Sequence, residues 1–238
     1  MRFRRHMEVG YNPFDRGYFP EPIPEGENGL LAAGGILNVE VLLEAYSKGI
    51  FPWYSEGSSI LWWSPDPRMV LFPERFRISR SLSQTLRKGG GTIRMDTAFG
   101  DVIGQCARQP RPGQKGTWIT GEMIDAYIRL HEEGFAHSVE VFRKDKLVGG
   151  LYGVSLGRTF FGESMFHLER DASKVALVHL VAFTRAKGFD MIDAQQSTPH
   201  LRSLGAEEIS RQDFLTLLSR SLRNETLRGR WINNDSPF

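Results

Sequence analysis

The stretch from residue 137 to residue 195 constrains the fold of this 238-residue chain more than any other. It opens with three apolar runs, His137–Phe142, Leu147–Leu156 and Thr159–Phe166, which are separated by short polar turns. Apolar runs of this length joined by short turns are typical of antiparallel β-strands. Glycines inside the second run predict a bulge or a close approach of another backbone.

A helix and a fourth strand follow. We expect Asp171 to cap a helix over Ala172–Lys187 that Gly188 closes, and Phe189–Ala194 to form a buried strand. The order strand–strand–strand–helix–strand resembles the core of the acetyltransferase-like (GNAT) fold. Members of that fold bind the pyrophosphate of acyl-CoA at the turn before the helix. Here that turn, His167–Ala172, has two acids and no glycine, which disfavours an anionic ligand.

The rest of the chain has the composition of a globular protein, with 40% apolar and 24% charged residues. The spacing of apolar residues predicts further helices capped by Asn38, Ser79, Asp96, Thr120 and Ser210. Prolines at positions 65 and 67 interrupt regular structure. We therefore predict an α+β fold, with a small N-terminal domain over residues 1–67 and a GNAT-like catalytic domain over residues 68–238.

Several classes of protein are disfavoured by simple counts. No run of 18 apolar residues is present, so we expect no transmembrane helix, and the basic N-terminus lacks the apolar run of a signal peptide. The single cysteine, Cys106, excludes an internal disulfide and fits a core position. We find no Cys/His spacing typical of a metal site. Because the net charge is only +2, contact with nucleic acid would need a local basic patch.

Eleven ordered sequence blocks together resemble the leucyl/phenylalanyl-tRNA–protein transferase family. They are NGLLAAGG (28–35), AYSKGIFPW (45–53), LWWSPDPR (61–68), ISRS (78–81), GTWIT (116–120), AHSVEVF (136–142), LVGGLYGV (147–154), FFGESMF (160–166), ASK (172–174), DMIDAQ (190–195) and SLGAEEISR (203–211).

This resemblance implies a bacterial, cytoplasmic aminoacyltransferase. It would move leucine or phenylalanine, and less well methionine, from aminoacyl-tRNA to a protein that begins with Arg or Lys, creating an N-degron for proteolysis. The family needs no metal and no CoA. The reaction is aminolysis of an activated ester, which requires orientation and stabilisation of an oxyanion rather than a covalent nucleophile.

The resemblance also assigns the site residues. Asp193 and Gln195 match the catalytic pair, and alternation along a strand places both side chains on one face, where the carboxylate could hold the glutamine amide. Without the family, a buried acid satisfied by backbone donors would be the favoured interpretation of Asp193, and the resemblance reverses that preference. Glu163, inside an apolar run, is either an edge-strand acid facing solvent or a carboxylate that binds the cationic N-terminus or the Arg or Lys side chain of the acceptor.

A pocket for the aminoacyl side chain and contacts to tRNA complete the predicted site. The pocket residues are Leu151, Phe160, Met165, Leu177, Leu180 and Ile192, for each of which plain core packing is the alternative. Trp53 and Trp118 are candidates for stacking on the terminal adenine of the tRNA, with core burial as the alternative. Arg80, Arg87 and Lys88 are expected to form a phosphate-binding patch, unless they form a solvated basic face.

Three alternative functions remain open at this point. A CoA-dependent acetyltransferase would bind acetyl-CoA. A related transferase would place leucine on acidic N-termini instead of basic ones. A non-enzymatic RNA-binding domain would bind tRNA whether or not it is aminoacylated.

Overall fold

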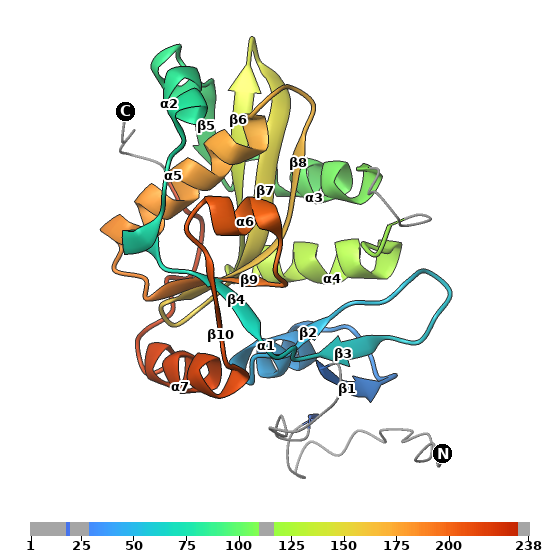
Figure 1. Cartoon of the computed structure of the whole chain (residues 1–238). Helices are drawn as coiled ribbons and strands as arrows, with labels where there is room; N and C mark the ends of the chain where they lie inside the picture. Colours follow the sequence, from blue (N-terminus) through green and yellow to red (C-terminus); the bar gives the residue numbers. More distant parts are fainter. Residues whose placement is uncertain (1–17, 20–28, 110–116, 233–238) are drawn as a thin grey trace.

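The computed structural model describes residues 18–19, 29–109 and 117–232, which form two sheets with helices packed around them (Figure 1). The smaller sheet is antiparallel, has the order β1-β3-β2, and consists of strands Leu30–Ala33 (β1), Phe51–Pro52 (β2) and Leu61–Trp63 (β3). Helix α1 (Val39–Ser47) packs beside it and begins as predicted, because the Asn38 side chain accepts a hydrogen bond from the Val41 amide at 2.8 Å.

The larger sheet has seven strands in the order β10-β4-β9-β8-β7-β6-β5. Its strands are Arg68–Leu71 (β4), Thr92–Met95 (β5), Ala136–Arg143 (β6), Lys146–Leu156 (β7), Thr159–His167 (β8), Met191–Gln195 (β9) and Glu207–Ile209 (β10). Every neighbouring pair is antiparallel except β8 and β9. That parallel pair is joined by a crossover helix, as parallel strands require.

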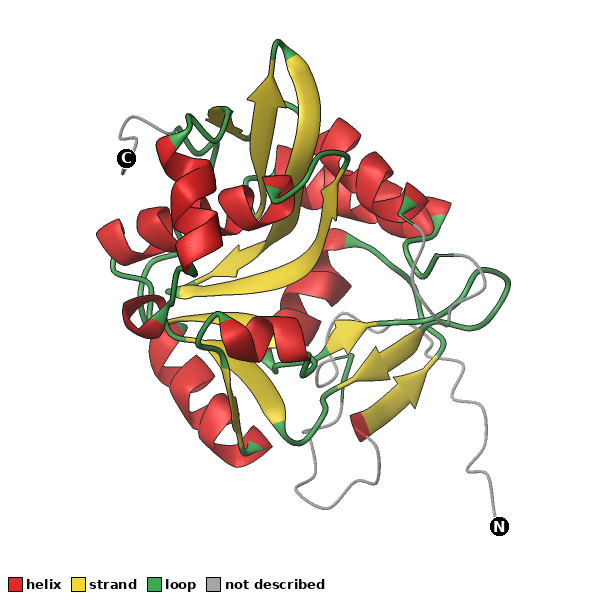
Figure 2. Ribbon diagram, turned by 45° about the horizontal axis from the view of Figure 1, so that its top comes forward, coloured by secondary structure: helices red, strands yellow, loops and turns green. Residues whose placement is uncertain are grey.

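Helices cover both faces of this sheet (Figure 2). They are α2 (Arg80–Arg87), α3 (Phe99–Arg108), α4 (Gly121–Glu132), α5 (Ala172–Ala186), α6 (Pro199–Ser203) and α7 (Arg211–Ser221), with a short 3₁₀ turn, η2, at Pro73–Arg75. One apolar cluster joins α5 and α2 to side chains such as Leu151 and Phe160, and the other joins α1, α3 and α4 to their strand neighbours Tyr152 and Phe161. Alternation along each strand thus divides the core between the two faces.

The predicted core of the fold is confirmed. Strands β6, β7 and β8, helix α5 and strand β9 follow one another in the expected GNAT-like order, and their bounds lie within a few residues of the predicted ones. The predicted fold class, α+β, is also confirmed, and the larger sheet is mixed.

The glycines of β7 permit the close approaches that their positions predict. A Cβ on Gly149 would lie 2.4 Å from the Cβ of Ala172, so the start of α5 can rest directly on the strand. A Cβ on Gly153 would lie 2.1 Å from the Phe161 carbonyl and 2.6 Å from the Phe160 ring, and the register with β8 shifts at this point. Larger residues at these two positions would therefore displace α5 or Phe160.

Two predicted helix caps are wrong in their bonding. Asp96 does not cap α3, whose N-cap residue is Ala98; it adopts a left-handed conformation (φ 54°) and turns its carboxylate to His137 and Ser138. Asp171 does occupy the cap position of α5, also with positive φ (63°), but its carboxylate pairs with Lys174 rather than with a helix amide. In both cases the carboxylate bonds to another partner instead of to the amides of the first helical turn.

The predicted domain boundary at residues 67/68 lies between β3 and β4. One apolar cluster nevertheless includes Tyr46 and Trp62 from before the boundary together with Phe161 and Phe214 from after it. The boundary of a separate folding unit remains a prediction.

Candidate active site

Three polar side chains meet where the parallel strands β8 and β9 stop pairing. The ladder joins Thr159–Phe161 to Met191–Asp193, and Glu163 and Gln195 lie two residues beyond the last pair on their respective strands. The Gln195 amide nitrogen Nε2 donates to Glu163 Oε1 at 2.7 Å across this fork. The structure therefore brings the three residues predicted to be catalytic, Glu163, Asp193 and Gln195, into one region.

Glu163 lies inside the sheet rather than at its edge, so the solvent-facing alternative is wrong. Its residue is 8% exposed, and the Tyr127 hydroxyl donates to Oε2 at 3.2 Å. The Tyr127 hydroxyl, from α4, is in turn hydrogen bonded to the Tyr46 hydroxyl, from α1. The two hydroxyls and the Glu163 carboxylate therefore form one hydrogen-bonded chain. The two groups that donate to this carboxylate, the Tyr127 hydroxyl and the Gln195 amide, are both neutral.

This setting raises the pKa of Glu163 to about 7. Removal from water is the largest cause, and the nearby negative charge of Asp193 adds to it, while hydrogen bonds from Tyr46, Tyr127 and Gln195 act in the opposite direction. Burial and the Glu163 charge also raise the pKa values of Tyr46 and Tyr127 well above 10. Glu163 can therefore gain or lose a proton near neutral pH, whereas the two tyrosines remain hydrogen-bond donors.

Asp193 holds the backbone of Gln195 rather than its side chain, which corrects the contact expected from strand alternation. Asp193 Oδ1 accepts from the Gln195 main-chain N–H at 2.9 Å, and Gln195 has a left-handed conformation with φ 60°. The register between β4 and β9 also shifts here. The turn at the end of β9 breaks the alternation, so the Gln195 side chain is free to point to Glu163.

The charge of Asp193 is matched by Arg68, a residue that the sequence analysis did not select. The Arg68 guanidinium donates to both carboxylate oxygens, at 2.8 and 2.6 Å, and the two side chains are 1% and 0% exposed. The guanidinium also lies over the rings of Phe51 (4.9 Å) and Phe214 (4.4 Å). The available signal was an arginine directly before the apolar run of β4, because a cation in such a position needs a buried acid.

An apolar cavity of about 250 Å³ opens beside this cluster. All six predicted pocket residues line it: Leu151, Phe160, Met165, Leu177, Leu180 and Ile192. Further lining residues that the sequence analysis did not assign to the pocket include Leu71, Tyr152, Ser164, Thr198, His200 and Leu201. Glu163 lies on the wall, so a ligand with an apolar end in the cavity would bring its other end to the carboxylate.

A second cavity, of about 240 Å³, adjoins the first one and shares part of its lining. Trp53 and Trp118 both line it, together with Phe51 and Gln195. Trp53 is half-buried with its ring 5.8 Å from that of Trp63, and Trp118 is buried. The two cavities share Gly162, Glu163, Ala194, Thr198 and Leu201, so the carboxylate lies at their junction.

The predicted basic patch is exposed on α2 and is separate from both cavities. Arg80, Arg87 and Lys88 are all exposed, and Arg80 and Arg87 lie two helical turns apart on the same face. A larger hollow of about 470 Å³ lies beside α7 and shares no lining residue with the two cavities.

Within residues 18–19, 29–109 and 117–232, no cluster of three or more His, Cys, Asp or Glu side chains has the arrangement of a metal site. None of the described helices combines the length and the apolarity that crossing a bilayer demands.

The sequence matches a known protein family over most of its length. The model of the leucyl/phenylalanyl-tRNA protein transferase family matches residues 70–219, and that of its N-terminal domain matches residues 35–66. Leucyl/phenylalanyl-tRNA–protein transferases from Anaeromyxobacter sp. (strain K) and Myxococcus xanthus (strain DK1622) are 56% and 54% identical over 213 residues, which cover 90% of this chain and 91% of each relative. The relative from Maridesulfovibrio salexigens is 53% identical over 224 residues, covering 94% of this chain and 93% of that protein.

Solved structures give more distant likenesses. A functionally unknown conserved protein from Staphylococcus epidermidis superposes with a TM-score of 0.40 at 10% identity, over 76% of this chain and 68% of that one. L-PGS from Bacillus licheniformis superposes with a TM-score of 0.39 at 11% identity, over 68% and 52% of the respective chains.

Proposed function

Because the chain belongs to the leucyl/phenylalanyl-tRNA–protein transferase family, whose members transfer an aminoacyl group from tRNA to a protein, we propose that it moves leucine or phenylalanine, and methionine less well, to proteins that begin with Arg or Lys. The new N-terminal residue would serve as an N-degron, and the reaction would take place in the cytoplasm. The observation that carries the proposal is the apolar cavity that meets an aromatic cavity at Glu163.

The two cavities match the two ends of an aminoacylated tRNA terminus. A leucine or phenylalanine side chain fits an apolar cavity of about 250 Å³, which would reject polar side chains because their hydrogen bonds to water would be lost. The adenine would stack on the indoles of Trp53 or Trp118 in the adjoining cavity. The ester that links the two groups would then lie over Glu163 and Gln195.

The chemistry at this junction is aminolysis. The acceptor amine attacks the ester carbonyl, a C–N bond forms, the C–O bond to the ribose breaks, and the proton lost by the amine balances the one gained by the ribose hydroxyl. A carboxylate with a pKa of about 7 is well matched to bind or deprotonate an N-terminal ammonium. The Gln195 oxygen, opposite the Nε2 that donates to Glu163, can accept a hydrogen bond from the same amine.

Asp193 acts in this proposal as a positioning residue. It fixes the backbone of Gln195 at positive φ, and Arg68 fixes Asp193 in turn. The aminoacyl ester is already activated, so orientation of this kind supplies a large part of the acceleration. Outside the site, the exposed arginines of α2 would bind phosphates of the tRNA acceptor stem by shape rather than by sequence.

The test is transfer of labelled leucine or phenylalanine from charged tRNA to matched peptides that begin with Arg, Lys or Asp. We expect label on the Arg and Lys peptides only. Label on the Asp peptide alone would assign the chain to transfer onto acidic N-termini. Binding of charged and uncharged tRNA without transfer would identify an RNA-binding protein, and acetylation of the peptides by acetyl-CoA would identify an acetyltransferase.

A further inference from the structure

The segment that follows α7 returns to the large sheet and is fastened to it at successive points. The Thr226 hydroxyl accepts from the Gly157 amide at 2.8 Å, and the Gly229 amide donates to the Gly134 carbonyl at 3.1 Å. The Arg228 guanidinium lies 4.2 Å from the centre of the Phe135 ring. This segment, residues 226–232, lies beyond the residues 70–219 that match the family model.

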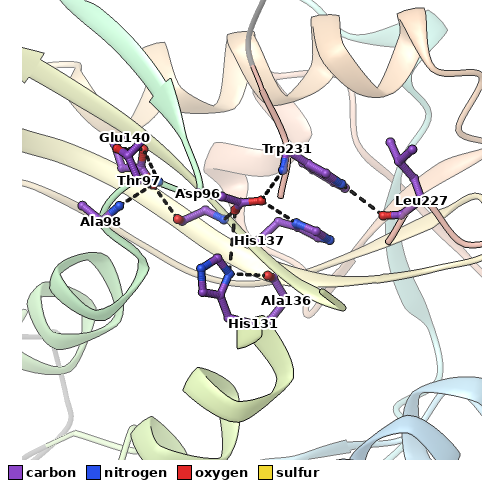
Figure 3. A network of polar contacts seen from close by, with 10 residues as sticks. Asp96, Thr97, Ala98, His131, Ala136, His137, Glu140, Leu227 and Trp231 are labelled. Atoms are coloured by element: carbon purple, nitrogen blue, oxygen red, sulfur yellow. Dashed lines mark hydrogen bonds and ion pairs between the residues drawn. The ribbon is translucent and has the colours of Figure 1, made fainter. Parts of the chain in front are cut away.

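The strongest fastening is at Asp96 (Figure 3). Its buried carboxylate accepts from the Trp231 amide at 2.7 Å, from His137 Nδ1 at 2.8 Å and from the Ser138 amide at 2.8 Å. The His137 ring stacks on the Trp231 indole, with centroids 3.8 Å apart and an interplanar angle of 7°. A buried carboxylate with three donors fixes the position of each donor, because a lost partner would leave the charge unsatisfied.

The indole that is fixed in this way packs near Phe160, a residue that lines the aminoacyl cavity. Trp231 is 3% exposed, and its ring lies 5.8 Å from Phe160, 4.6 Å from Phe183 and 5.9 Å from Phe189. Phe160 lines the cavity, whereas Trp231 does not. The Phe160 ring also lies over Gly153, where a Cβ would come within 2.6 Å of it.

We propose that the clamp formed by residues 226–232 with Asp96 and His137 sets the size of the aminoacyl cavity, and that Trp231 is a positioning residue for side-chain selection. The inference rests on the proposed function and names a residue outside the cavity as a determinant of its specificity. Trp231 prevents Phe160 from moving outward, because a packed interior leaves a displaced ring no other space. Removal of the indole gives Phe160 room to retreat, and the cavity then accommodates larger side chains.

The test compares Trp231→Ala and Trp231→Phe with the unchanged protein in competition between leucyl-tRNA and phenylalanyl-tRNA. We expect Trp231→Ala to shift the ratio of kcat/KM toward phenylalanine roughly five- to tenfold, within the range by which cavities of different size discriminate apolar side chains. Trp231→Phe keeps an aromatic ring and should restore most of the original ratio. If Trp231→Ala does not fold, Trp231→Leu serves the same comparison.

Trp62→Leu is the matched control. Trp62 is a buried tryptophan of the other apolar cluster that packs on Phe19 and lines neither cavity, so its loss costs stability without touching the cavity. The control should lower the melting temperature and leave the ratio unchanged. A ratio within twofold of the original in a folded Trp231→Ala or Trp231→Leu protein would overturn the proposal.

A second measurement separates this inference from the proposed function. Binding of the non-hydrolysable leucyl and phenylalanyl amides of adenosine, measured by calorimetry, reports the cavity without any transfer. The Trp231 variants should shift the ratio of the two affinities in the same direction. A protein that transfers neither amino acid but shows this shift would overturn the proposed function and support the clamp.

Discussion

The two carboxylates of the site differ in the partners that surround them. Glu163 is bonded by the Tyr127 hydroxyl and the Gln195 amide, whereas Asp193 is paired with the Arg68 guanidinium. Neutral donors leave the pKa of Glu163 raised by burial, so this group can exchange a proton with the acceptor amine. In the proposed function these two buried acids would therefore have different roles: Glu163 would contact the reacting amine, and Asp193 would position Gln195.

Substitution Glu163→Gln should change both the rate and its dependence on pH. The raised pKa means that the carboxylate forms as the pH rises through about 7, so the single-turnover rate of the unchanged protein should rise over that interval. Glu163→Gln should lower the rate at pH 8 by about a hundredfold and remove the inflection near 7. Rates measured from pH 5.5 to 8.5 test this.

Glu140→Gln is a suitable control for this experiment. Glu140 is also buried, and burial raises its pKa too. Its hydrogen-bond partners are Ser138 and Thr97, and its strand, β6, is separated from β8 by β7. The inflection should persist in this variant. An unchanged inflection in Glu163→Gln would assign the proton transfer to another group.

At the scale of elements, Arg68 of β4 joins three parts of the fold. Its guanidinium binds Asp193 of β9 and contacts Phe51 of β2 and Phe214 of α7. Strand β9 is therefore held from the N-terminal sheet and from α7 at the same time. A substitution at Arg68 should therefore lower both the free energy of unfolding and the rate of transfer.

A double-mutant cycle measures this coupling. Arg68→Met should cost about 3–5 kcal/mol of unfolding free energy, because it leaves Asp193 buried without its cation. Adding Asp193→Asn should recover much of that stability, since the uncompensated charge is removed, but transfer should remain about a hundredfold slow. Urea unfolding and single-turnover transfer are the two measurements. Additive stability losses in the double variant would show that the two side chains are not coupled.

Helix α2 carries the predicted contact to tRNA phosphates. Arg80→Ala and Arg87→Ala should each weaken binding of tRNA several-fold at low salt and reduce the slope of log K against log salt by about one. Both should act equally on tRNAs with different acceptor stems. Arg129→Ala on α4 removes the same charge from an exposed position on the opposite face of the sheet and should leave the slope unchanged. Equal slopes in all three variants would exclude α2 from the interface.

The elements were predictable where local chemistry determines them. Asn38, Ser79, Thr120 and Ser210 each cap a helix as their positions predict, since each side chain accepts from an amide only three residues away. Asp96 violates the same pattern because its partners, His137 and Trp231, are distant in sequence. Capping propensity contains no information about such partners.

Across the whole molecule, ionisation of Glu163 couples the site to stability. Its folded-state pKa of about 7 exceeds the ordinary value of 4.5, so the folded protein retains this proton to higher pH than the unfolded chain. The contribution of protonated Glu163 to the free energy of unfolding is complete below about pH 4.5 and is lost as the pH rises through 7. Glu163→Gln should therefore gain, relative to the unchanged protein, up to about 3 kcal/mol of unfolding free energy between pH 4.5 and pH 8.

Unfolding in urea at a series of pH values tests that expectation. Parallel stability curves for the two proteins would show that Glu163 has the same proton affinity in the folded and unfolded states. Calorimetric unfolding at pH 5 and pH 8 gives an independent comparison.

The site as a whole was predictable only through the family resemblance. Apolar spacing could not distinguish the cavity residues Leu177 and Leu180 from ordinary core residues on α5, and the resemblance was needed to select them. Arg68 and Trp231 were missed because their importance lies in tertiary contacts with Asp193 and Phe160. A single sequence shows which residue types are present but not which distant side chains they meet.

The fork between β8 and β9 has one more consequence, for how the substrate is admitted. The backbone ladder ends at Phe161 and Asp193. Beyond it, within the described part of the chain, the Gln195–Glu163 side-chain hydrogen bond is the one hydrogen bond found between the two strands. An incoming amine can exchange for that bond without disturbing any main-chain pairing of the sheet. The Gln195–Glu163 hydrogen bond can therefore break and re-form locally, while the sheet around it stays rigid through every turnover.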